Sequence, residues 1–469
     1  MNSSPQPVPG SFSPLRFAIR IAFVAGVAAL LFSARTASSL KPAATPAASQ
    51  RSNIHRGDYV GPEACAECHE EKYAAWKLHP HSRMNLNASP ATVLGDFSGA
   101  VLNYGGGQAL FERSGDLFFM TITRQEQRRR YRVTRTVGSR FTQMYVGLQV
   151  EGPEPKDDPV YRREGKLPFG YWLSRQAWFP ESYFDSDCPP EYDPKGQISL
   201  PAEDAHQTTW RKNCIYCHNT YPYAERLRAQ AGTTGFPAKD LSLRDSAPPD
   251  AEPGLAPSEL VTLGISCESC HFGGRDHAKR ELPIRFLPES PHLDFAKATP
   301  ERILNAREDP YVVNSICNQC HFSRGVSPYP NGAGTWNSRE SVDLALGGCA
   351  SKIRCTDCHD PHEAGPPGGG APDAQHLAAC LKCHPTLATP AARSEHTLHG
   401  ESVTCLDCHM PRIVQGLEAV LRTHQISTPG DVRMLAAGAP NACNLCHLDR
   451  SLEWTLATLK AGWGRSLTS

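Results

Sequence analysis

Cysteine and histidine dominate the residues of this 469-residue chain that could carry chemistry, with 18 Cys and 19 His. Sixteen of the cysteines form pairs separated by two residues, and a histidine follows each pair directly. Chance predicts about 0.03 copies of C-x-x-C-H at this composition, whereas the chain holds eight. The motifs are Cys65, Cys68 and His69; Cys214, Cys217 and His218; Cys267, Cys270 and His271; Cys317, Cys320 and His321; Cys355, Cys358 and His359; Cys380, Cys383 and His384; Cys405, Cys408 and His409; and Cys443, Cys446 and His447.

This spacing suits the covalent attachment of haem. Two thiols separated by two residues reach the two vinyl groups of one haem and become thioethers, and the next histidine binds the iron. A zinc ribbon does not require His after every second Cys, a thioredoxin-like pair would occur once or twice, and a disulfide framework belongs to shorter chains. We therefore predict eight covalently attached c-type haems as the cofactors.

Each haem iron that a motif histidine binds on one side needs a second axial ligand on the other. Position favours His362, in the sequence HDPH, and His396 or His399, shortly before Cys405. The sequence leaves His206, His292 and His376 open, and it places His55 in a linker, where we expect it to be exposed. His79 competes with His81 for one iron.

The chain begins with a pattern typical of export. Arg16 and Arg20 precede an apolar run at 21–32, and an A-x-S cleavage site ends at Ser39. The run is shorter than the roughly 20 residues that span a bilayer. It therefore indicates either a cleaved signal peptide or an N-terminal membrane anchor, and both place the protein outside the cytoplasm, in the periplasm or at the cell surface.

The motifs are unevenly spaced, with intervals of 149, 53, 50, 38, 25, 25 and 38 residues between first cysteines. Within the long first interval, residues 117–123, 131–134 and 141–150 have strand-like composition, whereas 69–78 and 452–462 are expected helices. The predicted fold is mainly α with much irregular structure and packed haems, and a small β-rich module is inserted between the first and second motifs. The predicted segments are 1–39 (signal or anchor), 40–57 (flexible tether), 58–96 (first haem segment), 97–200 (β-rich module) and 201–469 (seven-haem region).

Composition and charge narrow the functional classes. Gly and Pro total 77 residues, about 16% of the chain, which favours irregular backbone. The 48 basic and 48 acidic residues balance, without the basic excess that nucleic-acid binding requires. We find no Ser-His-Asp set or phosphate loop, so no catalytic residue is predicted outside the haem sites.

The haem motifs and their flanks resemble the multihaem cytochromes c related to cytochrome c-554 and the cytochrome c nitrite reductases, especially the tetratricopeptide-linked branch. The similar segments are YVGPEACAECHEEKYAAWKLHPHSRM, ISCESCHFGGRDH, SICNQCHFSR, VTCLDCHMPR and RTHQISTPGDVRMLAAGAPNACNLCHLDRSLEW. The resemblance implies that His81, His277 and His424 are second axial ligands. No tetratricopeptide array follows Trp463, and Gly273-Gly274 replaces the usual Gly-Pro-Gly turn.

Two cysteines, Cys188 and Cys349, lie outside the motifs. Outside the cytoplasm they could form a disulfide, but two separate buried thiols explain them almost as well.

Three functions remain open at this stage. Iron with two His ligands has no free position for a substrate, which favours an electron-transfer protein with donor and acceptor proteins as partners. The alternatives are an oxidoreductase of the nitrite, hydroxylamine or sulfur-oxyanion type with one open iron, and a subunit of a larger electron conduit. All eight motifs end in His, and the C-x-x-C-K variant of pentahaem nitrite reductases is absent.

Overall fold

A computed structural model describes residues 51–104, 107–124, 126–180, 191–192, 198–199, 210, 215–229, 257–291, 300–322, 327–365, 373–416 and 419–465. The segment 1–39, the first part of the tether, and Cys188, His206, Cys214 and His292 lie outside these residues. Arg51–Ser469 forms one compact unit. Among the described residues, we find no helix with the length and apolar character needed to span a membrane.

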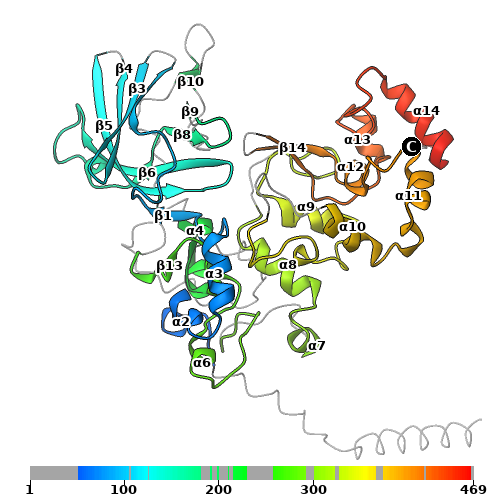
Figure 1. Cartoon of the computed structure of the whole chain (residues 1–469), viewed down its shortest axis with the longest axis horizontal. Coiled ribbons are helices and arrows are strands. Elements are labelled where there is room, and N and C mark those ends of the chain that lie inside the picture. Colours follow the sequence, from blue (N-terminus) through cyan, green and yellow to red (C-terminus); the bar gives the residue numbers. More distant parts are fainter. Residues whose placement is uncertain are drawn as a thin grey trace, which may run out of the picture. The chain divides into compact units, whose positions relative to one another are not determined.

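A nine-stranded antiparallel sheet is the largest regular element (Figure 1). Its strands are β1 (Asn85–Asn87), β2 (Ser98–Tyr104), β3 (Gly107–Ser114), β4 (Leu117–Arg124), β5 (Gln127–Val137), β6 (Thr142–Glu151), β7 (Gly165–Lys166), β8 (Phe169–Trp172) and β9 (Ala177–Pro180). The main strand order is β2-β3-β4-β5-β6-β8-β9, with β1 paired to β5 and β7 paired to β6. Eight of these nine strands lie within the expected module 97–200, and β1 precedes it. The short strands β1, β7, β8 and β9 carry too few residues to show an alternating pattern.

Alternating side chains of the sheet build an aromatic core. In β3, Ala109 and Phe111 are fully buried, and Trp178 of β9 stacks on Phe111 with ring centroids 3.6 Å apart. The Trp178 indole N–H donates to the Asp96 carbonyl at 3.0 Å, beside the start of β2. These contacts bring the two edge strands β2 and β9 together, so the sheet encloses its own core.

Short helices and turns make up most of the remaining described structure. The α-helices are α2 (Pro62–Ala66), α3 (Glu70–Leu78), α4 (Ile215–His218), α5 (Tyr223–Ala229), α6 (Arg275–Ala278), α7 (Pro300–Leu304), α8 (Pro310–Asn318), α9 (Glu340–Leu346), α10 (Asp373–Leu381), α11 (Pro390–Thr397), α12 (Cys405–His409), α13 (Val432–Ala436) and α14 (Leu452–Trp463). The 3₁₀ turns are η1 (Arg56–Asp58), η2 (Pro159–Tyr161), η5 (Pro257–Glu259), η6 (Cys267–Ser269), η7 (Cys355–Asp357) and η8 (Pro385–Leu387), and the two-stranded sheets pair β10 (Glu191–Tyr192) with β11 (Ile198–Ser199), β12 (Asn219–Thr220) with β13 (Thr262–Leu263), and β14 (Arg412–Gly416) with β15 (Ala419–Arg422). The classification of the whole chain as mainly α stays a prediction.

The end of the expected tether is packed against the region around the third motif. Ile54 is fully buried beside Tyr223 and Phe272. The Asn53 side chain donates to the Leu287 carbonyl at 2.9 Å and accepts the Glu289 N–H at 2.6 Å. These contacts order the chain from about Asn53 onward. His55, in turn, is half-buried rather than fully exposed.

A series of candidate haem-attachment sites

Each described motif forms one helical turn. In six motifs the histidine N–H donates to the carbonyl of the first cysteine at 2.9–3.0 Å, and the motif ending in His409 is the helix α12 itself. One turn brings residues four apart to the same side, so the first thiol and the imidazole lie together. In the motif ending in His218, α4 begins after Cys214, which lies outside the described residues.

Acidic side chains inside the motifs fix these turns. Asp357 accepts the Arg354 N–H at 2.8 Å, and Asp407 accepts the Thr404 N–H at 2.8 Å. Each carboxylate satisfies a donor at the start of its turn, as in a capping box. Each also pairs with a cation, since Arg354 lies 2.9 Å from Asp357 and Arg422 lies 2.7 Å from Asp407.

Glu268 plays a longer-range role within its motif. Its carboxylate, in a residue that is 1% exposed, accepts the N–H groups of Gly61 at 2.8 Å and Gly274 at 2.7 Å. It also accepts the Val60 N–H at 3.1 Å. Burial raises the pKa of Glu268, and the three N–H donors oppose that shift. This residue therefore ties the first motif to the third.

Five histidines from outside the motifs face a motif histidine across a gap of nearly constant width. The pairs are His69–His277 (6.1 Å between ring centroids), His271–His362 (6.2 Å), His359–His424 (6.3 Å), His396–His409 (6.3 Å) and His399–His447 (6.1 Å). In the first four pairs the rings are within 28° of parallel, and in the fifth they are tilted by 47°.

This spacing fits an iron between the rings. An imidazole nitrogen lies about 2 Å from the metal ion it binds, so two rings on opposite sides of one ion have centroids roughly 6 Å apart. Hydrogen bonds to backbone carbonyls also fix the orientation of two of these imidazole rings. Nδ1 of His277 donates to the Leu282 carbonyl at 3.1 Å, and Nδ1 of His409 donates to the Ser427 carbonyl at 2.8 Å. Such bonds leave Nε2 as the ligating atom, and the residues present therefore fit bis-His haems.

The remaining candidate histidines are placed less simply. His81 is partly buried, and its ring centroid lies 4.6 Å from that of His79. Burial, together with the charges of His79 and His321, lowers the pKa of His81 to about 3, so His81 is a neutral imidazole near the fourth motif. His376 of α10 interacts electrostatically with both His359 and His424. For His218, His321 and His384, no facing ring at the 6 Å spacing occurs among the described residues.

One motif histidine has a carboxylate partner. Nδ1 of His321 lies 3.0 Å from Oε2 of Glu340. The His321 side chain is 48% exposed in the structure. Partial desolvation disfavours the charged imidazole, but the hydrogen bond and charge of Glu340 outweigh this effect and raise the pKa of His321 to about 9. Burial also opposes the charge on Glu340, yet the contact with His321 lowers the pKa of that carboxyl to about 2.

Thiols of different motifs lie next to one another and reveal how the sites are arranged. In four cysteine pairs from different motifs, the two thiols lie close enough to shift each other's pKa. These pairs are Cys65–Cys267, Cys217–Cys320, Cys317–Cys355 and Cys380–Cys405. Three further pairs interact electrostatically, namely Cys270–Cys320, Cys358–Cys380 and Cys408–Cys443. The motifs therefore follow one another in the spatial order first, third, fourth, fifth, sixth, seventh and eighth, and the second lies beside the fourth.

Comparisons with known proteins agree with this class of site. No protein-family model matches the chain. The multiheme cytochrome MtrA of Shewanella baltica (strain OS185) is 28% identical over 158 residues, which are 33% of this chain and 38% of MtrA. The chain therefore matches much less than two thirds of that relative.

Similar solved structures include the outer cell wall cytochrome OcwA, at 17% identity and a TM-score of 0.46, with 86% of each chain covered. The undecaheme cytochrome from the S-layer of Carboxydothermus ferrireducens is 15% identical at a TM-score of 0.42, covering 88% of this chain and 63% of that one. The Wolinella succinogenes octaheme sulfite reductase MccA is 14% identical at a TM-score of 0.36, covering 80% and 59%. The eight motifs, the facing histidines and the likeness to MtrA together support a multihaem c-type cytochrome.

Proposed function

We propose that this chain is an octahaem cytochrome c that transfers electrons outside the cytoplasm. The observation that carries the proposal is the set of five histidine pairs, each joining a motif histidine to a histidine outside the motifs, with ring centroids 6.1–6.3 Å apart. Haem bound at a motif supplies one-electron chemistry, because its iron alternates between Fe(III) and Fe(II). Two histidines on one iron leave no position for a substrate, which favours electron transfer over catalysis.

The proposal gives each histidine a role. The motif histidines are the first axial ligands, and His277, His362, His396, His399 and His424 are the second ligands opposite the motif histidines they face. His81 is the proposed second ligand of the fourth motif, since it interacts with His321. For the second and sixth motifs, His206, His292 and His376 remain the candidates.

The adjacency of the motif thiols supports a continuous path. Each motif from the third to the eighth has a thiol near a thiol of the preceding motif in the spatial order given above. Haems attached through such thiols would lie close together at their thioether edges. The end motifs, ending in His69 and His447, are then the natural places for a donor and an acceptor protein to dock.

The finer classification belongs to the same proposal. We propose membership of the cytochrome c-554 and cytochrome c nitrite reductase group, and the resemblance of the haem segments supports this assignment. The apolar run at 21–32 makes it an exported protein of the periplasm or cell surface, with membrane attachment if that segment is retained. Its partners are redox proteins, and no nucleic acid is involved.

A redox titration combined with turnover assays tests this function. Oxidised holoprotein should accept eight electrons per chain in spectroelectrochemistry, and ferricyanide should reoxidise it fully. With reduced methyl viologen as donor, it should not turn over nitrite, hydroxylamine or sulfite. Sustained reduction of any of these three substrates would overturn the electron-transfer proposal and favour the oxidoreductase alternative.

A further inference from the structure

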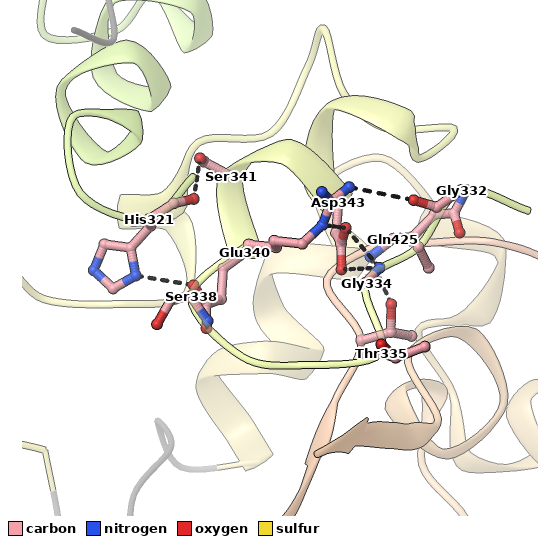
Figure 2. Close-up of polar contacts among 12 residues, drawn as sticks. His321, Gly332, Gly334, Thr335, Ser338, Glu340, Ser341, Asp343 and Gln425 are labelled. Carbon is pink, nitrogen blue, oxygen red and sulfur yellow. Dashed lines mark hydrogen bonds and ion pairs between the residues drawn. The ribbon is translucent and has the colours of Figure 1, made fainter. Parts of the chain in front are cut away.

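The fourth motif differs from its neighbours in the partner of its histidine. Nδ1 of His321 contacts the Glu340 carboxylate at 3.0 Å (Figure 2). His409 and the facing histidines His277 and His399 instead donate to neutral backbone carbonyls. Of the motif histidines in the described part of the chain, His321 is the one with a carboxylate oxygen at hydrogen-bond distance.

The structure holds Glu340 in this position. Its second oxygen, Oε1, accepts the Ser338 N–H at 2.9 Å. The next residue, Ser341, donates both its N–H and its hydroxyl to the His321 carbonyl. The first turn of α9 is therefore fastened to the backbone of His321 while its carboxylate reaches the ring, so the contact does not depend on a freely rotating side chain.

Nearby charges leave Glu340 available to His321. The neighbouring cation, Arg339, pairs with Asp343 at 3.5 Å, and Asp343 also accepts the Gly334 N–H at 3.0 Å. The Glu340 side chain is 28% exposed, so solvent screens its charge only in part. His424 also interacts electrostatically with the Glu340 carboxylate.

The fourth motif also lies where the series of sites branches. The Cys320 thiol lies close enough to Cys217 of the second motif and Cys270 of the third to interact with them electrostatically, and the Cys317 thiol interacts in the same way with Cys355 of the fifth. Electrons that pass between the first and last motifs, or that enter from the second, would all cross this position. The reduction potential of a haem at the fourth motif would therefore affect electron transfer along every route through the protein.

We propose that Glu340 is a positioning residue that lowers the reduction potential of the haem held by the fourth motif, through its hydrogen bond to His321. The inference rests on the proposed haem binding. A carboxylate that accepts the Nδ1 proton makes the imidazole a stronger donor to the metal ion. A negative charge nearby also stabilises Fe(III), which carries one more positive charge than Fe(II).

The test compares Glu340→Gln with the unmodified holoprotein in an EPR-monitored redox titration. Gln retains an oxygen that can accept the Nδ1 proton but removes the charge. At a fixed potential, the Fe(II)/Fe(III) ratio of one haem should rise about tenfold, which corresponds to 59 mV for a one-electron couple. The low-spin EPR signal of that haem should shift, and the seven others should change much less. Glu340→Ala should shift the ratio in the same direction and by more.

Glu126→Gln is the matched control, because Glu126 is exposed in the turn between β4 and β5 and the variant loses the same charge. It should leave all potentials unchanged. The inference fails if Glu340→Gln retains eight haems and no single haem changes its ratio or EPR signal. If the unmodified protein binds no haem at the fourth motif, the proposed haem binding itself is refuted. The number of haems per chain distinguishes this result from a failure of the inference about Glu340.

Discussion

Single residues of the proposed haem sites fall into two groups, those that would attach a haem and those that would complete its coordination. The attaching residues are contiguous in the sequence, whereas the facing histidines come from distant segments. His277, for example, faces a ring more than 200 positions earlier in the chain. The proposed coordination by two histidines therefore depends on the folded chain, and removing a facing histidine should affect one site only.

Replacing His424 with Ala tests this reasoning. His424 faces His359 at 6.3 Å, so the iron of the fifth motif should lose its sixth ligand and take water or an added ligand. We expect one high-spin haem per chain, and carbon monoxide should bind to that haem alone. EPR and visible titration with carbon monoxide measure both effects.

His55→Ala is the control. It also removes a histidine, but His55 lies at the start of η1 and is not one of the five histidines that face a motif ring. It should leave every haem low spin. If the His424→Ala variant contains only low-spin haems that do not bind carbon monoxide, then His424 is not an axial ligand.

The residue scale also shows how far sequence reasoning reaches. The motifs alone predict all sixteen attaching cysteines, and position or resemblance selected the five histidines that face a motif ring. Glu340 and Glu268 carried no such signal. Glu340 is 19 residues from His321, and Glu268 binds N–H groups 207 and 208 residues away. Contacts at these separations depend on tertiary packing, which spacing cannot supply.

Among the elements, the sheet follows its sequence pattern only in part. The expected strands at 117–123, 131–134 and 141–150 overlap β4, β5 and β6, and the expected helices overlap α3 and α14. Strand β1 was not anticipated, since Asn85–Asn87 joins the sheet only by pairing with β5. The two-residue strand β7 likewise forms only because it pairs with β6.

A buried ion pair should contribute strongly to the stability of this sheet. Arg129 and Glu154 are 8% and 11% exposed, with 2.6 Å between Nη2 and Oε1. Glu154→Gln removes the carboxylate charge that pairs with the Arg129 guanidinium, which costs about 3 kcal/mol. Hydrogen exchange of the β5 and β6 amides should accelerate roughly a hundredfold. The exposed pair Arg128–Glu151 (53% and 48%) provides the control, since Glu151→Gln should cost less than about 1 kcal/mol.

The same pair predicts a pH dependence. Burial alone would raise the pKa of Glu154, but the hydrogen bond from Arg129 more than offsets this and lowers it. The stabilisation is therefore present above the unfolded-state pKa of about 4.3 and is lost as the pH falls through the lower folded-state pKa. Exchange rates of the unmodified protein and Glu154→Gln should converge as the pH falls below about 4.3 and through the lower folded-state pKa of Glu154. A difference that persists there would contradict the ionic origin.

The sheet should also be independent of haem attachment. Residues 97–183 contain no C-x-x-C-H motif and no histidine. Phe111→Ala, at a fully buried position, should destabilise the sheet by about 3–5 kcal/mol, while the mature chain keeps eight haems. Phe111→Leu should show a smaller loss. Pyridine haemochrome quantitation against protein mass gives the count, and a reduced count in Phe111→Ala would show that the sheet supports a haem site.

For the whole molecule, the order of sites in space differs from their order in sequence. The first motif contacts the third, and the second contacts the fourth. The long interval after the first motif, which contains the sheet, accounts for part of this difference, since the chain leaves the haem region and returns. Intervals between motifs indicate such an excursion but cannot tell which motifs meet afterwards.

The complete chain should carry eight covalent haems. Each of the eight motifs supplies two thiols and a histidine, so the intact mass of the mature holoprotein should equal the processed polypeptide plus eight haems. The same spectrum locates the N-terminus and so distinguishes a cleaved signal peptide from a retained anchor. A fully matured chain that reaches a plateau at fewer haems would refute the assignment of at least one motif.

The central claim is that the haem irons are closed to substrates by histidine on both sides. The most direct measurement is the ratio of high-spin to low-spin haem in the oxidised holoprotein, counted by EPR and near-infrared spectroscopy before and after addition of nitrite. We predict eight low-spin haems per chain and no change with nitrite. A stoichiometric high-spin haem that binds nitrite would contradict the account and identify an open, catalytic iron.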